Sequence, residues 1–208
     1  MDELGFRLYL ITDRVAAARP TADIVEECLD AGLRAVQLRE KDLEVRPLLA
    51  MATGLRETTR RHGARLLIND RADVALACGA DGVQRTHLSL PVSALRAITP
   101  VGFLIGASAH STAEAREAAL QGADFVVFGP VYDTPSKRRY GPPRGLAALE
   151  AAAAAVSCPV LAVGGITPGR VPEILATGAA GVAVIGAVYA AARPADATKA
   201  FLDVLGRA

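Results

Sequence analysis

Two cations and an amide occupy alternate positions in the segment Gln37-Leu38-Arg39-Glu40-Lys41. Successive side chains of an extended chain point to opposite faces, so Gln37, Arg39 and Lys41 would share one face while Leu38 points the other way. Such a group suits a phosphorylated or carboxylated ligand, because Arg and Lys both bind these anions. The alternative is a surface ion pair between Arg39 and Glu40.

Two pairs of small residues offer a second kind of anion site. Gly164-Gly165 and Gly186-Ala187 each follow an apolar, β-branched run. Without large side chains in the way, backbone N–H groups can approach an anion, and the N-terminus of a short helix would add to the attraction. We therefore expect Gly164, Gly165, Gly186 and Ala187 to bind phosphate.

A third candidate is the segment TPSKRR, residues Thr134–Arg139, which continues as YGPPRG. Its hydroxyls, cations, Gly and Pro predict an active-site loop in which Thr134, Ser136 and Lys137 contact an anion. A solvated loop without a ligand is the alternative.

His110 could move a proton, because imidazole titrates near neutral pH, although a lone histidine is also common as a structural residue. Ser108 precedes it and is a candidate for substrate binding. Asn69-Asp70 ends another apolar run. Asp70 could contribute to a Mg²⁺ site, but Mg²⁺ usually needs one or two carboxylates together with phosphate oxygens.

Short apolar runs alternate with Ala- and Leu-rich amphipathic stretches along the whole chain. Several runs, such as FVVFG and GVAVIG, are apolar without alternation, which is typical of parallel strands covered on both faces. The expected strands are Phe6–Thr12, Ala35–Arg39, Ala64–Asn69, Gly82–Gln84, Gly102–Ser108, Phe125–Gly129, Val160–Gly164 and Gly181–Ile185. The expected helices are Thr21–Ala31, Val45–His62, Ala72–Cys78, Val92–Ile98, Ser111–Gln121, Gly145–Val156, Val171–Ala176 and a tail from Ala187.

This alternation predicts an α/β protein with a (β/α)8 (TIM) barrel fold, a single domain over residues 1–208. Glycine ends a predicted helix at Gly32, Gly79, Gly122 and Gly178, each just before an apolar strand. A doubly wound open sheet is the alternative, but its first strand should lead into a Gly-rich turn, and LYLITDR contains no Gly. In a barrel, the candidate residues above all lie at or just after the carboxyl ends of strands and would meet at one face.

Composition narrows the class of protein. The 208 residues are 51% hydrophobic and 22% charged, with 23 Lys and Arg against 22 Asp and Glu. A net charge near zero argues against a nucleic-acid or membrane-surface binder. The three cysteines are scattered, no basic leader precedes the first strand, and charges or Gly interrupt every apolar run. We expect a cytoplasmic protein with a small-molecule partner.

Five motifs in order resemble the thiamine phosphate synthase and thiazole tautomerase superfamily over essentially the whole chain. They are LYLITDR, VQLREK, LLINDRADVALACGADGV, FGPVYDTPSK and AVGGITP. The resemblance implies a (β/α)8 barrel that binds a thiazole phosphate, and a homodimer.

In the synthase branch, hydroxymethylpyrimidine pyrophosphate is joined to the thiazole phosphate with Mg²⁺ as cofactor. The resemblance then implies that Asp70 binds Mg²⁺ and that Gly164 and the Gly186 turn hold the thiazole phosphate. The residues implied to hold the pyrimidine pyrophosphate are Gln37, Arg39, Lys41, Asn69, Thr134, Ser136 and Lys137.

In the tautomerase branch, a proton moves on a thiazole carboxylate phosphate without a metal, and a histidine such as His110 is the acid–base group. Synthases usually carry GVHLGQ and then an acid that is the second Mg²⁺ ligand, whereas this chain has Gln84 in place of the His and Ser89 in place of the acid. We therefore predict a thiazole tautomerase with His110, Lys137 and Arg39 as catalytic residues. The alternatives are a thiamine phosphate synthase and a non-catalytic thiazole-phosphate-binding barrel.

Overall fold

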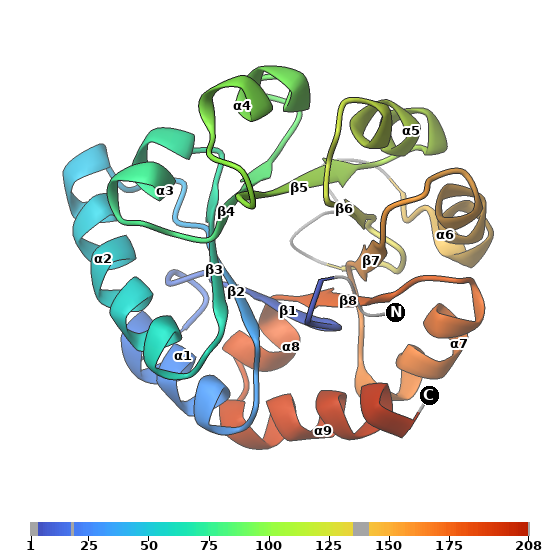
Figure 1. The fold of residues 1–208 in the computed structure, drawn as a ribbon. Coiled ribbons are helices and arrows are strands. Elements are labelled where there is room, and N and C mark those ends of the chain that lie inside the picture. Colours follow the sequence, from blue (N-terminus) through green and yellow to red (C-terminus); the bar gives the residue numbers. More distant parts are fainter. Residues whose placement is uncertain (1–3, 18, 135–141, 208) are drawn as a thin grey trace.

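The computed structural model describes residues 4–17, 19–134 and 142–207. Eight parallel strands form a closed barrel in the order β1 to β8, and helices surround it (Figure 1). The strands are β1 (Leu8–Ile11), β2 (Ala35–Leu38), β3 (Arg65–Asn69), β4 (Gly82–Arg85), β5 (Leu104–Ala109), β6 (Phe125–Phe128), β7 (Val160–Val163) and β8 (Gly181–Val184). The predicted (β/α)8 barrel is confirmed.

The helices follow the strands in alternation, and α9 closes the outer ring beside α1 (Figure 1). They are α1 (Thr21–Asp30), α2 (Val45–Arg61), α3 (Ala72–Ala77), α4 (Val92–Ile98), α5 (Thr112–Leu120), α6 (Gly145–Ala154), α7 (Val171–Ala176), α8 (Gly186–Tyr189) and α9 (Pro194–Arg207), with a 3-10 turn at Pro168–Arg170. Within the described ranges, no helix is long and apolar enough to cross a membrane.

The helix ends show why the alternation could be recognised. Gly32, Gly79, Gly122 and Gly178 all have a positive φ, as predicted for the left-handed residue that ends a helix. At the start of α5, the Ser111 hydroxyl accepts a hydrogen bond from the Glu114 N–H, as predicted for a capping box.

The expected single tail from Ala187 is wrong. The short helix α8 ends at Tyr189, and α9 begins at Pro194. Proline lacks a backbone N–H and is therefore favoured in the first turn of a helix and excluded from its interior. The break follows from Pro194, which the Ala-rich sequence around it obscures.

Three aromatic rings fill the interior of the barrel. Phe6, Tyr9 and Phe125 lie with ring centroids 5.6 to 5.7 Å apart, and both contacts of Phe125 are edge-to-face. Glycine makes room for them, since a Cβ at Gly106 would lie 2.4 Å from both the Phe125 ring and the Gln84 amide oxygen. The centre of the barrel is therefore packed, and open space is found at its rim.

Candidate functional site

The inward-facing residues above these rings divide the mouth of the barrel into two halves. Strands β2 to β5 contribute polar side chains, namely Gln37, Asn69, Gln84 and Ser108. Strands β6 to β8 and β1 contribute apolar ones, namely Val127, Val163, Ile185 and Ile11. The two halves suit two different ligand groups placed side by side.

Hydrogen bonds join the polar side chains in pairs. Gln37 Nε2 donates to Asn69 Oδ1 at 2.9 Å, and Asn69 Nδ2 donates to Asp70 Oδ2 at 2.8 Å. Gln84 Nε2 donates to Ser108 Oγ at 3.1 Å, while Gln84 Oε1 is buried without a partner among the described residues. The structure thus brings together Gln37, Asn69, Asp70 and Ser108, as the sequence predicted.

The apolar half opens into a pocket of about 360 Å³. It contains all four residues predicted to bind phosphate, Gly164, Gly165, Gly186 and Ala187, together with Thr134. Asp13, which the sequence did not indicate, also lines it. Among the described residues, Asp13 is the charged side chain that lines this pocket, and the backbone N–H groups of the two turns can supply positive potential there.

Two of these glycines are required by close packing. Gly164 and Gly165 have φ values of +100° and +65°, which favour glycine. A Cβ at Gly164 would lie 2.6 Å from Pro130 Cβ, and one at Gly165 would lie 2.6 Å from the Asp133 carbonyl oxygen. At Gly186, by contrast, a Cβ would meet nothing within 4 Å.

A polar cluster braces this glycine turn from outside the pocket. The Arg170 guanidinium donates to the Gly165 carbonyl and lies 4.2 Å from the centre of the Tyr132 ring. The Tyr132 hydroxyl donates to Glu173 at 2.6 Å. Burial, and to a smaller extent the contact with this carboxylate, raises the pKa of Tyr132 to about 12. These contacts hold the segment that leads into Thr134 against the turn after β7.

Asp70 sits at the end of β3 with a φ of +59°, which is unusual for a residue with a side chain. Its Oδ1 accepts hydrogen bonds from the Thr86 N–H at 3.1 Å, from the Thr86 hydroxyl at 2.6 Å and from the Ser89 hydroxyl. Ser89 therefore lies beside Asp70, where the sequence comparison placed the missing acid. Thr86 was not predicted, since only the fold brings its loop to Asp70.

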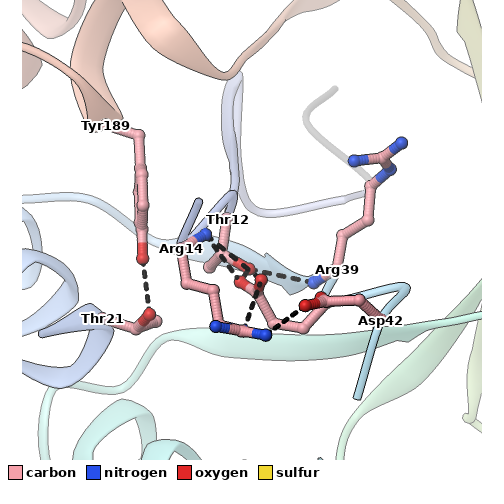
Figure 2. A network of polar contacts seen from close by, with 7 residues as sticks. Thr12, Arg14, Thr21, Arg39, Asp42 and Tyr189 are labelled. Carbon is pink, nitrogen blue, oxygen red and sulfur yellow. Dashed lines mark hydrogen bonds and ion pairs between the residues drawn. The ribbon is translucent and has the colours of Figure 1, made fainter. Parts of the chain in front are cut away.

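Glu40 has a structural role that the sequence analysis missed, because it accepts hydrogen bonds from the segment that follows β1. Its side chain is 2% exposed, accepts from the Thr12 hydroxyl at 2.6 Å and accepts from the Arg14 N–H at 3.1 Å. The Thr12 hydroxyl in turn accepts from the Arg39 N–H at 2.9 Å (Figure 2). The alternation of side chains that placed Leu38 on the buried outer face of β2 places Glu40 on that face too. This alternation could have predicted that Glu40 is buried.

Within the described residues, the Glu40 network includes the backbone N–H of Arg39 but not its charged side chain. Figure 2 shows the Arg39 guanidinium extending away from Thr12 and Asp42, and Arg39 forms no ion pair within the described ranges. The alternative of an Arg39–Glu40 surface pair is therefore wrong. Lys41 is exposed at the same rim.

His110 links the ends of two strands. Its Nδ1 donates to the Gly129 carbonyl, and its backbone N–H donates to Glu114 Oε2 at 2.8 Å. Because a carbonyl can only accept, Nδ1 carries the proton in the neutral ring. The predicted residues Ser136 and Lys137 lie outside the described residues. Among those described, no cluster of three His, Cys, Asp or Glu side chains could hold a metal ion.

Residues 8–188 match the family model described as thiamine monophosphate synthase. The chain belongs to this family. A Methanoculleus marisnigri thiamine-phosphate synthase is 44% identical over 206 residues, which cover 99% of this chain and 98% of the relative. A Geobacter sulfurreducens protein, provisionally named a thiamine-phosphate synthase, is 50% identical over 99% of this chain and 97% of its own length.

A solved structure of the thiamine monophosphate synthase family has the same fold. The thiamine phosphate pyrophosphorylase from Pyrococcus furiosus superposes with a TM-score of 0.89 at 37% identity, over 97% of this chain and 96% of that chain.

These similarities overturn the prediction of a thiazole tautomerase, because the full-length relatives are named as synthases. The prediction gave too much weight to Ser89. One carboxylate together with the oxygens of a pyrophosphate can be enough for Mg²⁺, so the loss of a second acid does not exclude a synthase. The role of His110 as the tautomerase acid–base group falls with that prediction.

Proposed function

We propose that this protein is a thiamine-phosphate synthase, which joins hydroxymethylpyrimidine pyrophosphate to a thiazole phosphate and releases pyrophosphate. The observation that carries the proposal is the divided mouth of the barrel. A glycine-lined pocket adjoins a polar floor flanked by two cations, which suits two anionic substrates held next to each other.

The polar half would take the pyrimidine pyrophosphate. Gln37 and Asn69 present amide groups to a ring that carries donors and acceptors, and Ser108 adds a hydroxyl. Arg39 and Lys41 at the rim would neutralise the pyrophosphate, together with Lys137 from the segment that follows Thr134, and the Ser136 hydroxyl would donate a hydrogen bond to it.

The apolar half would take the thiazole phosphate. The N–H groups of the two small-residue turns, Gly164-Gly165 and Gly186-Ala187, would bind the phosphate, while Val163 and Ile185 contact the thiazole ring. The two halves belong to the same end of one barrel, so the thiazole nitrogen would lie close to the carbon that carries the pyrophosphate.

The reaction exchanges one bond for another. The bond between the pyrimidine methylene carbon and the pyrophosphate oxygen breaks, and its electron pair leaves with pyrophosphate. The lone pair of the thiazole nitrogen forms the new carbon–nitrogen bond, so the product is a thiazolium cation. No proton has to move, and the protein's main task is to orient both substrates and stabilise the leaving group.

The residues fit a Mg²⁺ ion that is shared with pyrophosphate. Asp70, whose carboxylate lies at this edge of the polar floor, would be the protein ligand of the metal. Bound Mg²⁺ would neutralise part of the charge on the leaving group. The cations Arg39 and Lys41 would neutralise another part of it.

The deciding experiment offers the purified protein both substrates with and without Mg²⁺ and measures thiamine phosphate and pyrophosphate. We expect equal amounts of the two products, formed only with the metal. In Lys41→Ala, loss of one charge-assisted contact of about 1.5–3 kcal/mol raises KM for the pyrimidine pyrophosphate by roughly 10- to 150-fold. The matched control Lys199→Ala, which removes an exposed cation on α9, should leave KM unchanged. Saturable binding of both substrates without any product would refute the proposal.

A further inference from the structure

The carboxylate of Asp70 is already occupied by hydrogen bonds from this chain. Its Oδ2 accepts from Asn69 Nδ2 at 2.8 Å. Its Oδ1 accepts from the Thr86 N–H and hydroxyl, at 3.1 and 2.6 Å, and from the Ser89 hydroxyl. Three donors therefore crowd Oδ1, which has about two lone-pair sites, while one donor points at Oδ2.

A Mg²⁺ ion that approached Asp70 alone would find Oδ1 crowded by donors and would gain only one negative charge from the protein. Mg²⁺ gives up its water reluctantly and is usually held by one or two carboxylates plus substrate phosphates. The side chains nearest to Asp70 Oδ1 are hydroxyls, which are neutral. The balance changes only when a polyanion supplies the remaining charge.

We propose that this chain binds Mg²⁺ only together with pyrophosphate, because the residue beside Asp70, Ser89, is neutral and adds no second carboxylate to hold the metal alone. Ser89 and Thr86 hold Asp70 in place until a metal–pyrophosphate complex arrives. This inference rests on the proposed function for the identity of the anion, but metal binding can be measured without turnover.

Replacing Ser89 by an acid should remove the dependence. The Ser89 hydroxyl is in hydrogen-bond contact with Asp70 Oδ1, so a carboxylate at position 89 would lie beside that of Asp70. Two neighbouring carboxylates repel each other and attract a divalent cation strongly. Leu88→Asp is the matched control, because it adds the same charge one residue earlier, where the side chain is 80% exposed.

The experiment is a calorimetric titration of the full-length protein with MgCl2 alone, with sodium pyrophosphate alone and with pyrophosphate in saturating Mg²⁺. For the parent chain, we expect no saturable heat with MgCl2 alone and at least tenfold tighter binding of pyrophosphate when Mg²⁺ is present. Asp70→Asn should abolish this enhancement by Mg²⁺. Ser89→Asp should bind MgCl2 alone, with Kd lowered at least tenfold, whereas Leu88→Asp should behave as the parent.

A second variant and a second measurement guard against misfolding. Ser89→Ala removes one hydrogen bond to Asp70 without adding charge, so it should still bind Mg²⁺ only with pyrophosphate. The thermal midpoint of Ser89→Asp should rise with MgCl2 alone, and that of the parent should not.

Saturable binding of MgCl2 alone to the parent chain, lost in Asp70→Asn, would overturn the proposal by revealing a resident site. Failure of folded Ser89→Asp to gain Mg²⁺ binding would overturn it as well. If Mg²⁺ and pyrophosphate bind together as expected but no thiamine phosphate forms from the two substrates, the proposed function fails and this inference stands.

Discussion

Removing the Glu40 carboxylate should destabilise the protein far more than its position between two surface cations suggests. Glu40→Ala leaves the buried Thr12 hydroxyl and the Arg14 N–H without their acceptor. Burial raises the pKa of Glu40 above its usual range, and the hydrogen bonds from Thr12 and Arg14 lower it in part. The carboxylate is thus costly to bury and depends on its donors.

The size of the effect follows from these two contacts. A hydrogen bond to a charged group contributes about 1.5–3 kcal/mol, and breaking a buried charge network costs about 3–5 kcal/mol. We therefore expect Glu40→Ala to lose about 3–5 kcal/mol. With about 2–4 °C lost per kcal/mol in a domain of this size, the thermal midpoint should fall by roughly 6–20 °C. Glu40→Gln keeps an acceptor and removes the desolvation cost, so it should stay within about 1 kcal/mol of the parent.

Thermal and urea unfolding of the parent, Glu40→Ala and Glu40→Gln measure these differences. The control is Glu57→Ala, which removes an exposed carboxylate from the C-terminal part of α2. If Glu40→Ala unfolds within 1 °C of Glu57→Ala, the Glu40 carboxylate does not hold the segments after β1 and β2 together, and the reasoning fails.

Three other changes test separate parts of the molecule. Gly186→Ala places a methyl group in the open pocket and should weaken binding of the thiazole phosphate by at least tenfold in calorimetry, whereas Gly169→Ala, equally open but outside the pocket, should have no effect. His110→Gln should keep turnover within about tenfold of the parent, since no proton moves and an amide can still donate to a carbonyl; a loss of 10²–10⁴ would instead reveal a proton shuttle. The Thr58 carbonyl and then the Asp30 carboxylate raise the pKa of His62, so its stabilising effect is complete below its ordinary pKa and is lost as pH rises through the raised value. His62→Gln should accordingly lower the thermal midpoint at about pH 5.5 but not at about pH 9, and an equal loss at both values would contradict this explanation.

The barrel could be predicted from the sequence because local signals repeat. Each strand is an apolar run, and several follow a glycine that must end a helix, such as Gly32 and Gly122. The residues at the strand ends, including Gln37 and Asn69, could be assigned to one face since parallel strands place their carboxyl ends together.

The contacts that distinguish this site could not be predicted in the same way. Ser89 and Thr86 reach Asp70 across 19 and 16 residues, and their bonds depend on how the loop after β4 folds back over β3. Glu40 entered the sequence analysis only as a possible surface partner of Arg39, although the alternation along the strand places it among buried groups. The prediction of a tautomerase was wrong for a chemical reason. It assumed that the protein must supply both carboxylates for Mg²⁺, whereas the oxygens of a pyrophosphate can supply the ligands that the chain lacks.

The packed rings of Phe6, Tyr9 and Phe125 have a consequence for traffic through the barrel. They fill the barrel interior, so in the proposed reaction both substrates would enter, and both products would leave, at the carboxyl ends of the strands. The pocket of Gly165 and Gly186 lies at that same end. For the proposed enzyme, product release and substrate entry would then share one route, so slow release of either product would delay binding of the next substrate.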